Sequence, residues 1–261
     1  MKYNYEYEIK YQEVDGKKKL RLFNLENYLL EVAGTVADEL GFGIAKLHPR
    51  GLTWILTRLS VEMYELPTHC EKVRFETWIE SNAHMLSTRD FRIYSGDKLI
   101  GQCKSVWAVL DLEKREIVNI FDDPMFEGCV DGEVLPMPRA VRMTSLPDAQ
   151  QIPYTIRYSD LDYNRHCNSC KYLQAMLDTY LPLELTKWQL GQPAAGSVVP
   201  DAESGTGETW RLDIHYSREV QAGERTTIAY QNEGDMIRYQ MLNSEGLTSC
   251  AAVIGKVKIE N

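Results

Sequence analysis

The feature that most constrains the fold is a short segment that occurs twice in the chain. Residues 7–15 read YEIKYQEVD and residues 154–162 read YTIRYSDLD, so both copies keep two tyrosines, an isoleucine, a basic residue and two acidic residues in the same order. A segment repeated over a long separation is typical of two copies of one structural unit. The alternative is two unrelated domains with a chance match, but the similar pattern after each copy favours the repeat.

Each copy is followed by apolar residues at helical spacing, which predicts an amphipathic helix. The spacing of three and four positions holds at Leu25, Tyr28, Leu29, Val32, Ala33, Val36 and Leu40, and again at Leu173, Met176, Leu177 and Tyr180. Gly41 and Pro182 are predicted to end the two helices, because glycine favours a helix C-terminus and proline does not continue a helix.

The pattern then changes to alternation of apolar and polar residues, which indicates half-buried strands. Strands are predicted at 59–63, 73–80, 88–94, 99–111, 208–217, 225–231, 236–243 and 247–258. A helix with one apolar stripe must cover that stripe, and an antiparallel sheet with one apolar face can do so. The predicted fold class is therefore α+β, with two units that each hold a strand, a long helix and an antiparallel sheet.

Shifts in composition predict where the two units meet. The proline-bearing segment 124–150 is the expected linker between a first domain at 1–123 and a second domain at 151–261. Residues 184–207 are rich in Gly, Pro, Ala and Ser, and this composition predicts an exposed loop or lid.

The charge and the cysteines exclude several classes of protein. The chain has 261 residues and a formal net charge of -9, which argues against nucleic acid as the main partner because phosphate binding needs a basic surface. No apolar run approaches the roughly 20 residues that span a bilayer. The N-terminal segment has neither signal-peptide nor transit-peptide character, so a cytoplasmic location is expected. The six cysteines are scattered, which favours reduced thiols over disulfides.

The second copy of the repeat leads into polar residues at every second position. These residues are Asp160, Asp162, Asn164, His166 and Asn168. In an extended chain, residues 162, 164 and 166 would point the same way and bring a carboxylate, an amide and an imidazole together. The structural alternative is a hydrogen-bonded turn with Asn168 as the cap of the next helix. The first copy has Gly16-Lys17-Lys18-Lys19 at the matching place, so the fold does not require Asn and His there.

These residues resemble the signature of a known family. The stretch from Asp160 to Asn168 (DLDYNRHCN), followed by Lys171-Tyr172, resembles the DLDxNxHxNNxKY signature of acyl-ACP thioesterases. Residues 52–58 (LTWILTR), 105–107 (SVW) and 216–219 (YSRE) are similar to that family's LxWVxTR, SxWV and YRRE strands. The family often has Cys after this Glu, where the present chain has Val220. The resemblance implies two tandem hot-dog domains, the N-terminal one binding the acyl chain and the C-terminal one catalytic.

The resemblance also implies an activity and a set of site residues. The implied reaction is hydrolysis of the thioester of fatty acyl-ACP to free fatty acid and holo-ACP. Glu219 is the implied general base, Asn164 and His166 position the water and the thioester, and Asp162 orients them. The implied substrate-binding residues are Asn168, Trp54, Arg58 and Trp107. Alternation along residues 212–216 puts Glu219 on the polar face of its strand, unless a β-bulge reverses the parity.

Three classes of function stay open on the sequence. They are an acyl-ACP hydrolase, another hot-dog enzyme such as an acyl-CoA thioesterase or a dehydratase, and a non-catalytic acyl-binding protein. An acyl carrier protein is the expected partner, the basic cluster at 17–21 is a candidate contact for it, and a homodimer is compatible with the family. No cofactor and no metal are expected, because Cys167 and Cys170 form a single C-x-x-C without two further ligands at matching spacing.

Overall fold

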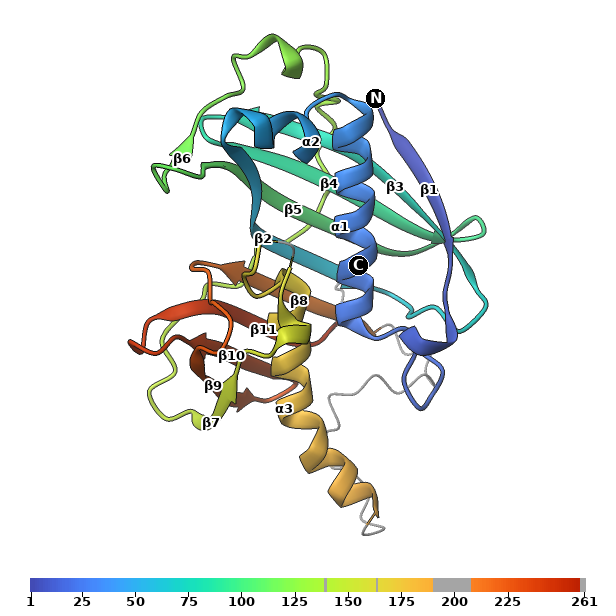
Figure 1. Cartoon of the computed structure of the whole chain (residues 1–261). Helices are drawn as coiled ribbons and strands as arrows, with labels where there is room; N and C mark the ends of the chain where they lie inside the picture. The colour runs from blue at the N-terminus through green and yellow to red at the C-terminus, as the bar shows by residue number, and fades with distance from the viewer. Residues whose placement is uncertain (139, 163, 190–207, 259–261) are drawn as a thin grey trace. The chain divides into compact units, whose positions relative to one another are not determined.

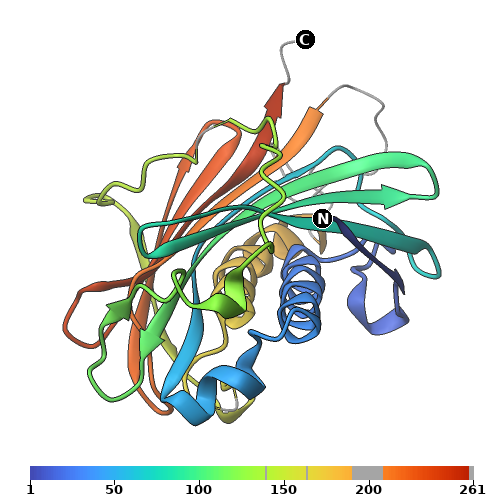
Figure 2. The ribbon, with the colours of Figure 1, turned by 90° about the horizontal axis from the view of Figure 1, so that it is seen from above.

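The computed structural model describes residues 1–138, 140–162, 164–189 and 208–258. The chain divides into two compact units, Met1–Arg139 and Ala140–Asn261. Each unit contains one long helix and one antiparallel sheet, as Figures 1 and 2 show for each unit in turn. The predicted α+β class is therefore confirmed.

In the first unit the long helix lies against one face of the antiparallel sheet (Figure 2). Its elements are β1 (Tyr3–Glu8), α1 (Leu22–Glu39), α2 (Ile44–Leu47), β2 (Leu52–Met63), β3 (Lys72–Ala83), β4 (Leu86–Ser95), β5 (Lys98–Asp111) and β6 (Ile117–Val118). The sheet order is β1-β3-β4-β5-β2, and β6 pairs with β5. The Tyr28 ring of α1 stacks on Phe75 of β3 with 5.7 Å between centroids, and Ala37 of α1 packs in one cluster with Ile79 of β3.

The first helix follows its predicted pattern and its predicted end. The apolar residues from Leu25 to Val36 that define the helical spacing are all buried. The helix stops before Gly41, which has a φ of 83° and donates its N–H to the Asp38 carbonyl at 3.1 Å. This left-handed backbone conformation is easily adopted by glycine, which is why the helix ends here.

The second unit repeats the same arrangement. Its elements are β7 (Gln150–Thr155), α3 (Ser169–Gln189), β8 (Glu208–Tyr216), β9 (Arg225–Glu233), β10 (Met236–Leu242) and β11 (Thr248–Lys258). The sheet order is β7-β9-β10-β11-β8. Strands β7 to β11 thus take the same places in this order as β1 to β5 take in the first unit. The repeat predicted from residues 7–15 and 154–162 is therefore confirmed, and two unrelated domains are excluded.

The repeated segments are only partly strand, and two local predictions, the end of the second helix and the start of the following loop, were wrong. The strands next to the repeated segments end at Glu8 and Thr155, and 3₁₀ turns follow at Tyr11–Glu13 and Tyr158–Asp160. An acidic side chain stabilises each turn. The Glu13 carboxylate accepts the N–H of Lys10 at 2.6 Å, and the Asp160 carboxylate accepts the N–H of Arg157 at 2.8 Å.

Helix α3 does not stop at Pro182 but continues to Gln189. A proline removes one backbone donor and disfavours a helix interior, but it does not forbid continuation. Residues 184–189 of the predicted loop are thus helical, and the rest, 190–207, lies outside the described residues.

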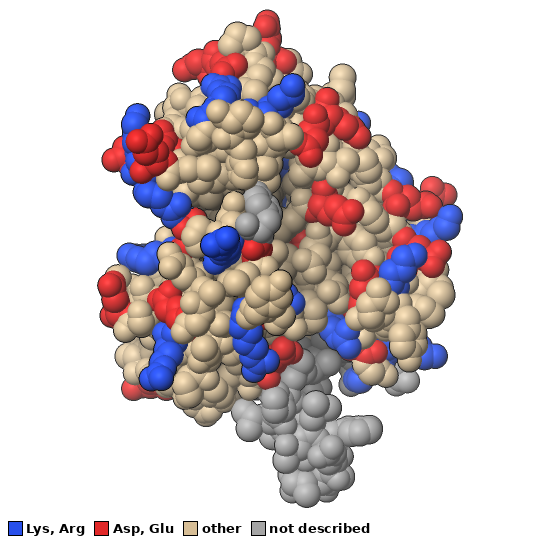
Figure 3. All heavy atoms as spheres, in the orientation of Figure 1, with Lys and Arg blue, Asp and Glu red and all other residues tan. Residues whose placement is uncertain are grey.

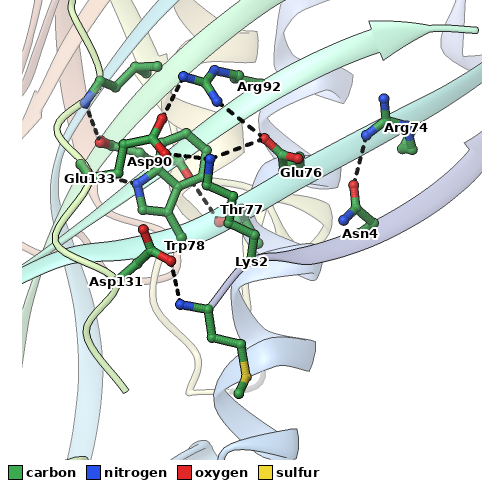
Figure 4. Close-up of polar contacts among 12 residues, drawn as sticks. Lys2, Asn4, Arg74, Glu76, Thr77, Trp78, Asp90, Arg92, Asp131 and Glu133 are labelled. Atoms are coloured by element: carbon green, nitrogen blue, oxygen red, sulfur yellow. Dashed lines mark hydrogen bonds and ion pairs between the residues drawn. The ribbon is translucent and has the colours of Figure 1, made fainter. Parts of the chain in front are cut away.

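Residues 131–135 of the predicted linker pack on the sheet of the first unit, on the face opposite α1. Figure 4 shows Glu133 and Asp131 of this segment over Trp78 and Arg92. The Trp78 indole donates to the Glu133 carbonyl at 2.8 Å, and the Arg92 guanidinium binds the Glu133 carboxylate at 2.6 Å. Leu135 is buried. Phe126 and Cys129, earlier in the linker, are also buried, but they pack with Ala37 of α1 and Ile79 on the helix side of the sheet. In the second unit, residues 141–144 are bound in the same way, since the Val141 N–H donates to Asp213 at 3.1 Å and Gln240 donates to the Thr144 carbonyl at 2.9 Å.

Asp90 of β4 carries a buried carboxylate under this segment. Its Oδ2 accepts the Leu135 N–H at 3.0 Å, and its Oδ1 lies 3.6 Å from the Lys104 Nζ. Burial, followed by a hydrogen bond with Glu80, raises the pKa of Asp90 to about 7. The folded state therefore binds one proton more than the unfolded state between about pH 4 and about pH 7. The stability that this group contributes is complete below its ordinary pKa and is lost as pH rises through about 7.

Asp90→Asn is expected to change how stability depends on pH. Asparagine resembles the protonated acid and has no proton to lose, so the stability of the variant should rise relative to that of the wild type as pH rises from about 4 to about 7. The gain should reach at most about 1.4 kcal/mol per pH unit. Urea unfolding at a series of pH values measures it, with the exposed Glu113→Gln as control. A difference between variant and wild type that stays constant with pH would contradict the assignment.

Among the helices of the described residues, none is both long and apolar enough to cross a membrane.

Candidate active site

The alternating polar residues of the second unit form a tight turn rather than an extended strand. The Asp162 N–H donates to the His166 carbonyl at 2.8 Å, and Arg165 has a φ of 67°. The Asp162 carboxylate accepts the backbone N–H of Asn164 at 2.8 Å and of His166 at 3.0 Å. The expectation that an extended chain points these side chains one way was wrong, because Asp162 bends the backbone around its own carboxylate.

The first unit contains the same turn with different side chains. The Asp15 carboxylate accepts the N–H of Lys17 and of Lys19, both at 2.9 Å, and Lys18 has a φ of 63°. The geometry thus matches residue for residue, with Asp15 in the place of Asp162. The fold needs the aspartate but neither the asparagine nor the histidine, as the sequence comparison predicted.

His166 and Glu219 come together at the second unit's turn. The His166 Nε2 lies 3.6 Å from the Glu219 Oε2, and the side chains are 25% and 36% exposed. The pair is therefore close enough to share a water molecule and is open to solvent. Glu219 lies beyond the end of β8 at Tyr216, so the alternation of that strand does not decide the direction of its side chain.

Backbone contacts identify the residue that replaces Glu219 in the first unit. Cys167, directly after His166, donates its N–H to the Val220 carbonyl at 2.8 Å, and Leu20, directly after Lys19, donates to the Pro67 carbonyl at 2.9 Å. Leu66 thus occupies the place of Glu219. The first unit has two lysines and a leucine where the second has an amide, an imidazole and a carboxylate.

Two tyrosines connect the start of α3 to the segment that carries Glu219. The Tyr172 hydroxyl donates to the Arg218 carbonyl and the Tyr216 hydroxyl donates to the Ser169 carbonyl, each at 3.4 Å, and the two rings are 5.9 Å apart. Burial raises the pKa of Tyr172, which keeps its hydroxyl protonated as a donor. The sequence analysis did not assign this role, although both tyrosines lie within the motifs that it quoted.

Comparison with known proteins gives the family. Residues 1–127 match the acyl-ACP thioesterase N-terminal domain and residues 144–191 match the acyl-ACP thioesterase C-terminal domain. The chain belongs to the acyl-ACP thioesterase family. A similar solved structure, an acyl-ACP thioesterase from Bacteroides thetaiotaomicron, has a TM-score of 0.81 and 26% identity over 98% of each chain. The 12:0-ACP thioesterase from Umbellularia californica, at 19% identity and a TM-score of 0.74, shares the fold over 98% of this chain and 97% of its own. The predicted hot-dog fold of both units is confirmed.

Curated plant thioesterases are similar to this chain over part of their length. An oleoyl-acyl carrier protein thioesterase from Coriandrum sativum is 27% identical over 71% of this chain and 55% of its own length. The corresponding thioesterase 1 from Arabidopsis thaliana is 25% identical over 71% of this chain and 56% of its own length. The chain therefore spans about half the length of these curated relatives.

Asn168 has a structural role in this family member. Its Oδ1 accepts the Cys170 N–H at 3.0 Å, and its own N–H donates to the Asp160 carbonyl at 2.8 Å. Asn168 therefore caps α3, as the structural alternative predicted. A role for it in substrate binding stays a prediction, as do the catalytic roles of Asp162, Asn164, His166 and Glu219.

The three predicted substrate-binding residues of the first unit do not share one face of the sheet. Trp54 pairs with Val109 and Trp107 pairs with Leu56, so both tryptophans lie on one face. The register shifts between Leu56 and Arg58, and this bulge turns Arg58 to the opposite face. The Trp54 indole donates to the Phe42 carbonyl at 2.9 Å and the Trp107 indole donates to the Ser105 hydroxyl at 2.9 Å.

Cys167 and Cys170 are buried beside the turn and form no disulfide. Burial raises the pKa of the Cys167 thiol to about 12, so the thiolate is a negligible fraction at neutral pH. No cluster of His, Cys, Asp and Glu suited to a metal is present among the residues that the structure describes.

Replacing both cysteines by serine is therefore expected to leave any thioester hydrolysis within about tenfold of the wild type, because a buried thiol that stays protonated is a poor nucleophile. Free-thiol release from acyl-ACP measures this hydrolysis. An acyl group trapped on either cysteine by rapid quench and mass spectrometry would contradict the expectation.

Proposed function

We propose that the protein hydrolyses the thioester of a fatty acyl chain carried on acyl carrier protein, and that the second unit contains the catalytic residues. The observation that carries the proposal is the His166–Glu219 pair, with 3.6 Å between Nε2 and Oε2, on a turn whose counterpart in the first unit has neither group. A turn with a purely structural purpose would not need this pair. Membership of the acyl-ACP thioesterase family supports the same reaction.

The proposed chemistry uses Glu219 as the general base. Its carboxylate accepts a proton from a water molecule held between it and His166, and the water oxygen attacks the thioester carbonyl carbon. The oxyanion that forms needs hydrogen-bond donors, which the Asn164 side chain and the N-terminal end of α3 supply in this scheme. When the carbon–sulfur bond breaks, the proton passes from Glu219 to the leaving sulfur. The products are a free fatty acid and holo-ACP, and Asp162 acts by holding the turn.

The proposed role of each unit follows from its side chains. The first unit has lysines and a leucine at the catalytic positions, but two partly buried tryptophans, Trp54 and Trp107, on one face of its sheet. We assign acyl-chain binding to this unit, with one active site per chain. The boundaries 1–123, 124–150 and 151–261 stay a proposal for its domains.

The proposed partner is an acyl carrier protein, which is acidic. On the face drawn in Figure 3, Lys and Arg side chains are interspersed with Asp and Glu rather than gathered in one area. A local contact fits this distribution better than a broad basic surface. The turn at Lys17 and Lys18, both exposed, is the proposed contact.

The test is a comparison of kcat/KM for one acyl chain carried on acyl carrier protein and on coenzyme A, with free-thiol release as the readout. The proposal predicts a preference for the carrier protein. A preference for coenzyme A would assign the protein to the acyl-CoA thioesterases, and binding without thiol release would assign it to the non-catalytic acyl-binding proteins.

A further inference from the structure

Arg89 of β4 lies inside the first unit without an acceptor for its guanidinium. Its exposed fraction is 5%, and its Nη1 is shielded from solvent with no hydrogen-bond partner. Among the described residues, no side-chain hydrogen bond or ion pair involves this arginine. A guanidinium has five N–H donors, and a buried charge without a partner is strongly unfavourable. A ligand that supplies the missing acceptor would remove this penalty.

The register of the sheet shows which way Arg89 faces. It pairs with Ile79 of β3 on one side and with Ser105 of β5 on the other, and directly opposed residues share a face. Ile79 packs in one cluster with Ala37 of α1, so this is the helix-facing side of the sheet. Arg92, three residues later, lies on the opposite side, where Figure 4 shows it against Glu133.

The same face holds a second polar atom without a partner. Asn82 of β3 pairs with Ser87 of β4, which pairs in turn with Trp107 of β5, so Asn82, Trp107 and Arg89 are near neighbours on one face. The Asn82 Oδ1 is shielded from solvent and has no hydrogen-bond partner, while its Nδ2 donates to the Cys129 Sγ at 3.4 Å. A donor and an acceptor are therefore both unsatisfied beside a tryptophan assigned above to acyl-chain binding.

The charge on Arg89 is not compensated from within the unit. Burial lowers the pKa of Arg89 to about 10, and the groups that act against this effect are Cys129, Tyr3 and Tyr5. None of these three is a carboxylate. The guanidinium stays charged at neutral pH, because a pKa of about 10 is well above it.

We propose that Arg89 and Asn82 bind a hydroxyl group on the acyl chain of the substrate, so that the protein selects hydroxyacyl chains over unsubstituted ones. The proposal rests on the acyl-chain binding assigned to the first unit. A hydroxyl oxygen accepts from Arg89 while its O–H donates to the Asn82 Oδ1. A carboxylate would only accept and would leave the Asn82 oxygen unpaired, and an unsubstituted chain would satisfy neither group. Sites built to bind a hydroxyl discriminate strongly against analogues that lack it.

The test uses binding of free fatty acids, so its readout does not depend on hydrolysis. Palmitic acid and its monohydroxylated isomers, with the hydroxyl moved along the chain, are titrated into the wild-type protein by calorimetry. At least one isomer is expected to bind about 10-fold or more tightly than palmitic acid, the effect typical of a hydrogen bond to a charged group. Arg89→Met is expected to abolish this preference while keeping the affinity for palmitic acid.

The matched control is Arg92→Met, which removes an arginine from the opposite face of the same strand and should keep the preference. If no isomer binds more tightly than palmitic acid to the wild type, the proposal is overturned without reference to any variant. It is also overturned if folded Arg89→Met retains the preference. Thiol release from acyl-ACP without a hydroxyl preference would overturn this inference alone, and a hydroxyl preference in binding without thiol release would overturn the proposed hydrolysis alone.

Discussion

Glu219→Gln is expected to lower turnover of acyl-ACP by about 10²-fold or more, because it removes the proton acceptor at nearly constant shape. The side chain is 36% exposed, so the free energy of unfolding should barely change. Single-turnover release of free thiol measures the rate, and circular dichroism with thermal unfolding checks the fold. Glu245→Gln, an exposed carboxylate of the same unit, is the control and should keep wild-type turnover.

Double variants test whether Glu219 acts together with its neighbours. His166→Ala and Asn164→Ala should each lower turnover. Combining either with Glu219→Gln should cost less than the product of the single losses, because residues that act on one water molecule work as a unit. Multiplicative losses would show that these side chains act in separate steps, and near-normal turnover in Glu219→Gln would remove Glu219 from the mechanism.

Asp162→Ala and Asp15→Ala are expected to have similar effects on stability and different effects on turnover. Each aspartate accepts two backbone N–H groups in an equivalent turn, so each substitution should cost about 1–2 kcal/mol of stability. Only Asp162 holds His166 in place. Its loss should lower turnover by about 10-fold or more, since a displacement of about 1 Å can cost about 10²-fold.

The two turns act as controls for each other. Urea unfolding gives the stability of both variants. Thiol release at saturating acyl-ACP gives their turnover, so that weaker docking at the turn of Lys17 and Lys18 does not enter the comparison. Equal losses of turnover in Asp15→Ala and Asp162→Ala would mean that the effect comes from destabilisation, which would contradict the positioning role of Asp162.

The periodic parts of the fold could be predicted from the sequence, because burial of one face leaves a regular pattern. Alternation located the long strands, and the spacing from Leu25 to Val36 located α1. The end of α3 could not be predicted in the same way. Pro182 weakens a helix by a local effect, and the packing that decides whether the helix continues leaves no signature at that position.

The backbone of the candidate site was not predicted, and the catalytic roles of its residues stay predictions. Residues 162–166 alternate as a strand does, yet one carboxylate with two N–H groups in reach is enough to form a turn. The first copy of the repeat indicates a turn at this place, because Gly16 and three lysines follow Asp15 there. The sequence analysis used the alternation of residues 212–216 to place Glu219. Strand β8 ends at Tyr216, so this alternation does not extend to Glu219.

The alternation of apolar and polar residues around Arg89 predicts a buried cation, and the sequence analysis did not use this pattern. Within the predicted strand 88–94, residues 89, 91 and 93 fall on the apolar side, so the charged residue among Phe91 and Ile93 marks an interior cation. A charge on the apolar side of a strand is costly unless a partner meets it. Such a position therefore indicates either a buried ion pair or a ligand.

The most direct test of the account is a single turnover of acyl-ACP by the wild-type protein, with free fatty acid and the thiol of holo-ACP quantified together. The account predicts equal amounts of both products, formed at a rate that falls by about 10²-fold or more in Glu219→Gln. Acyl-ACP recovered intact, or thiol release that continues unchanged in Glu219→Gln, would contradict it.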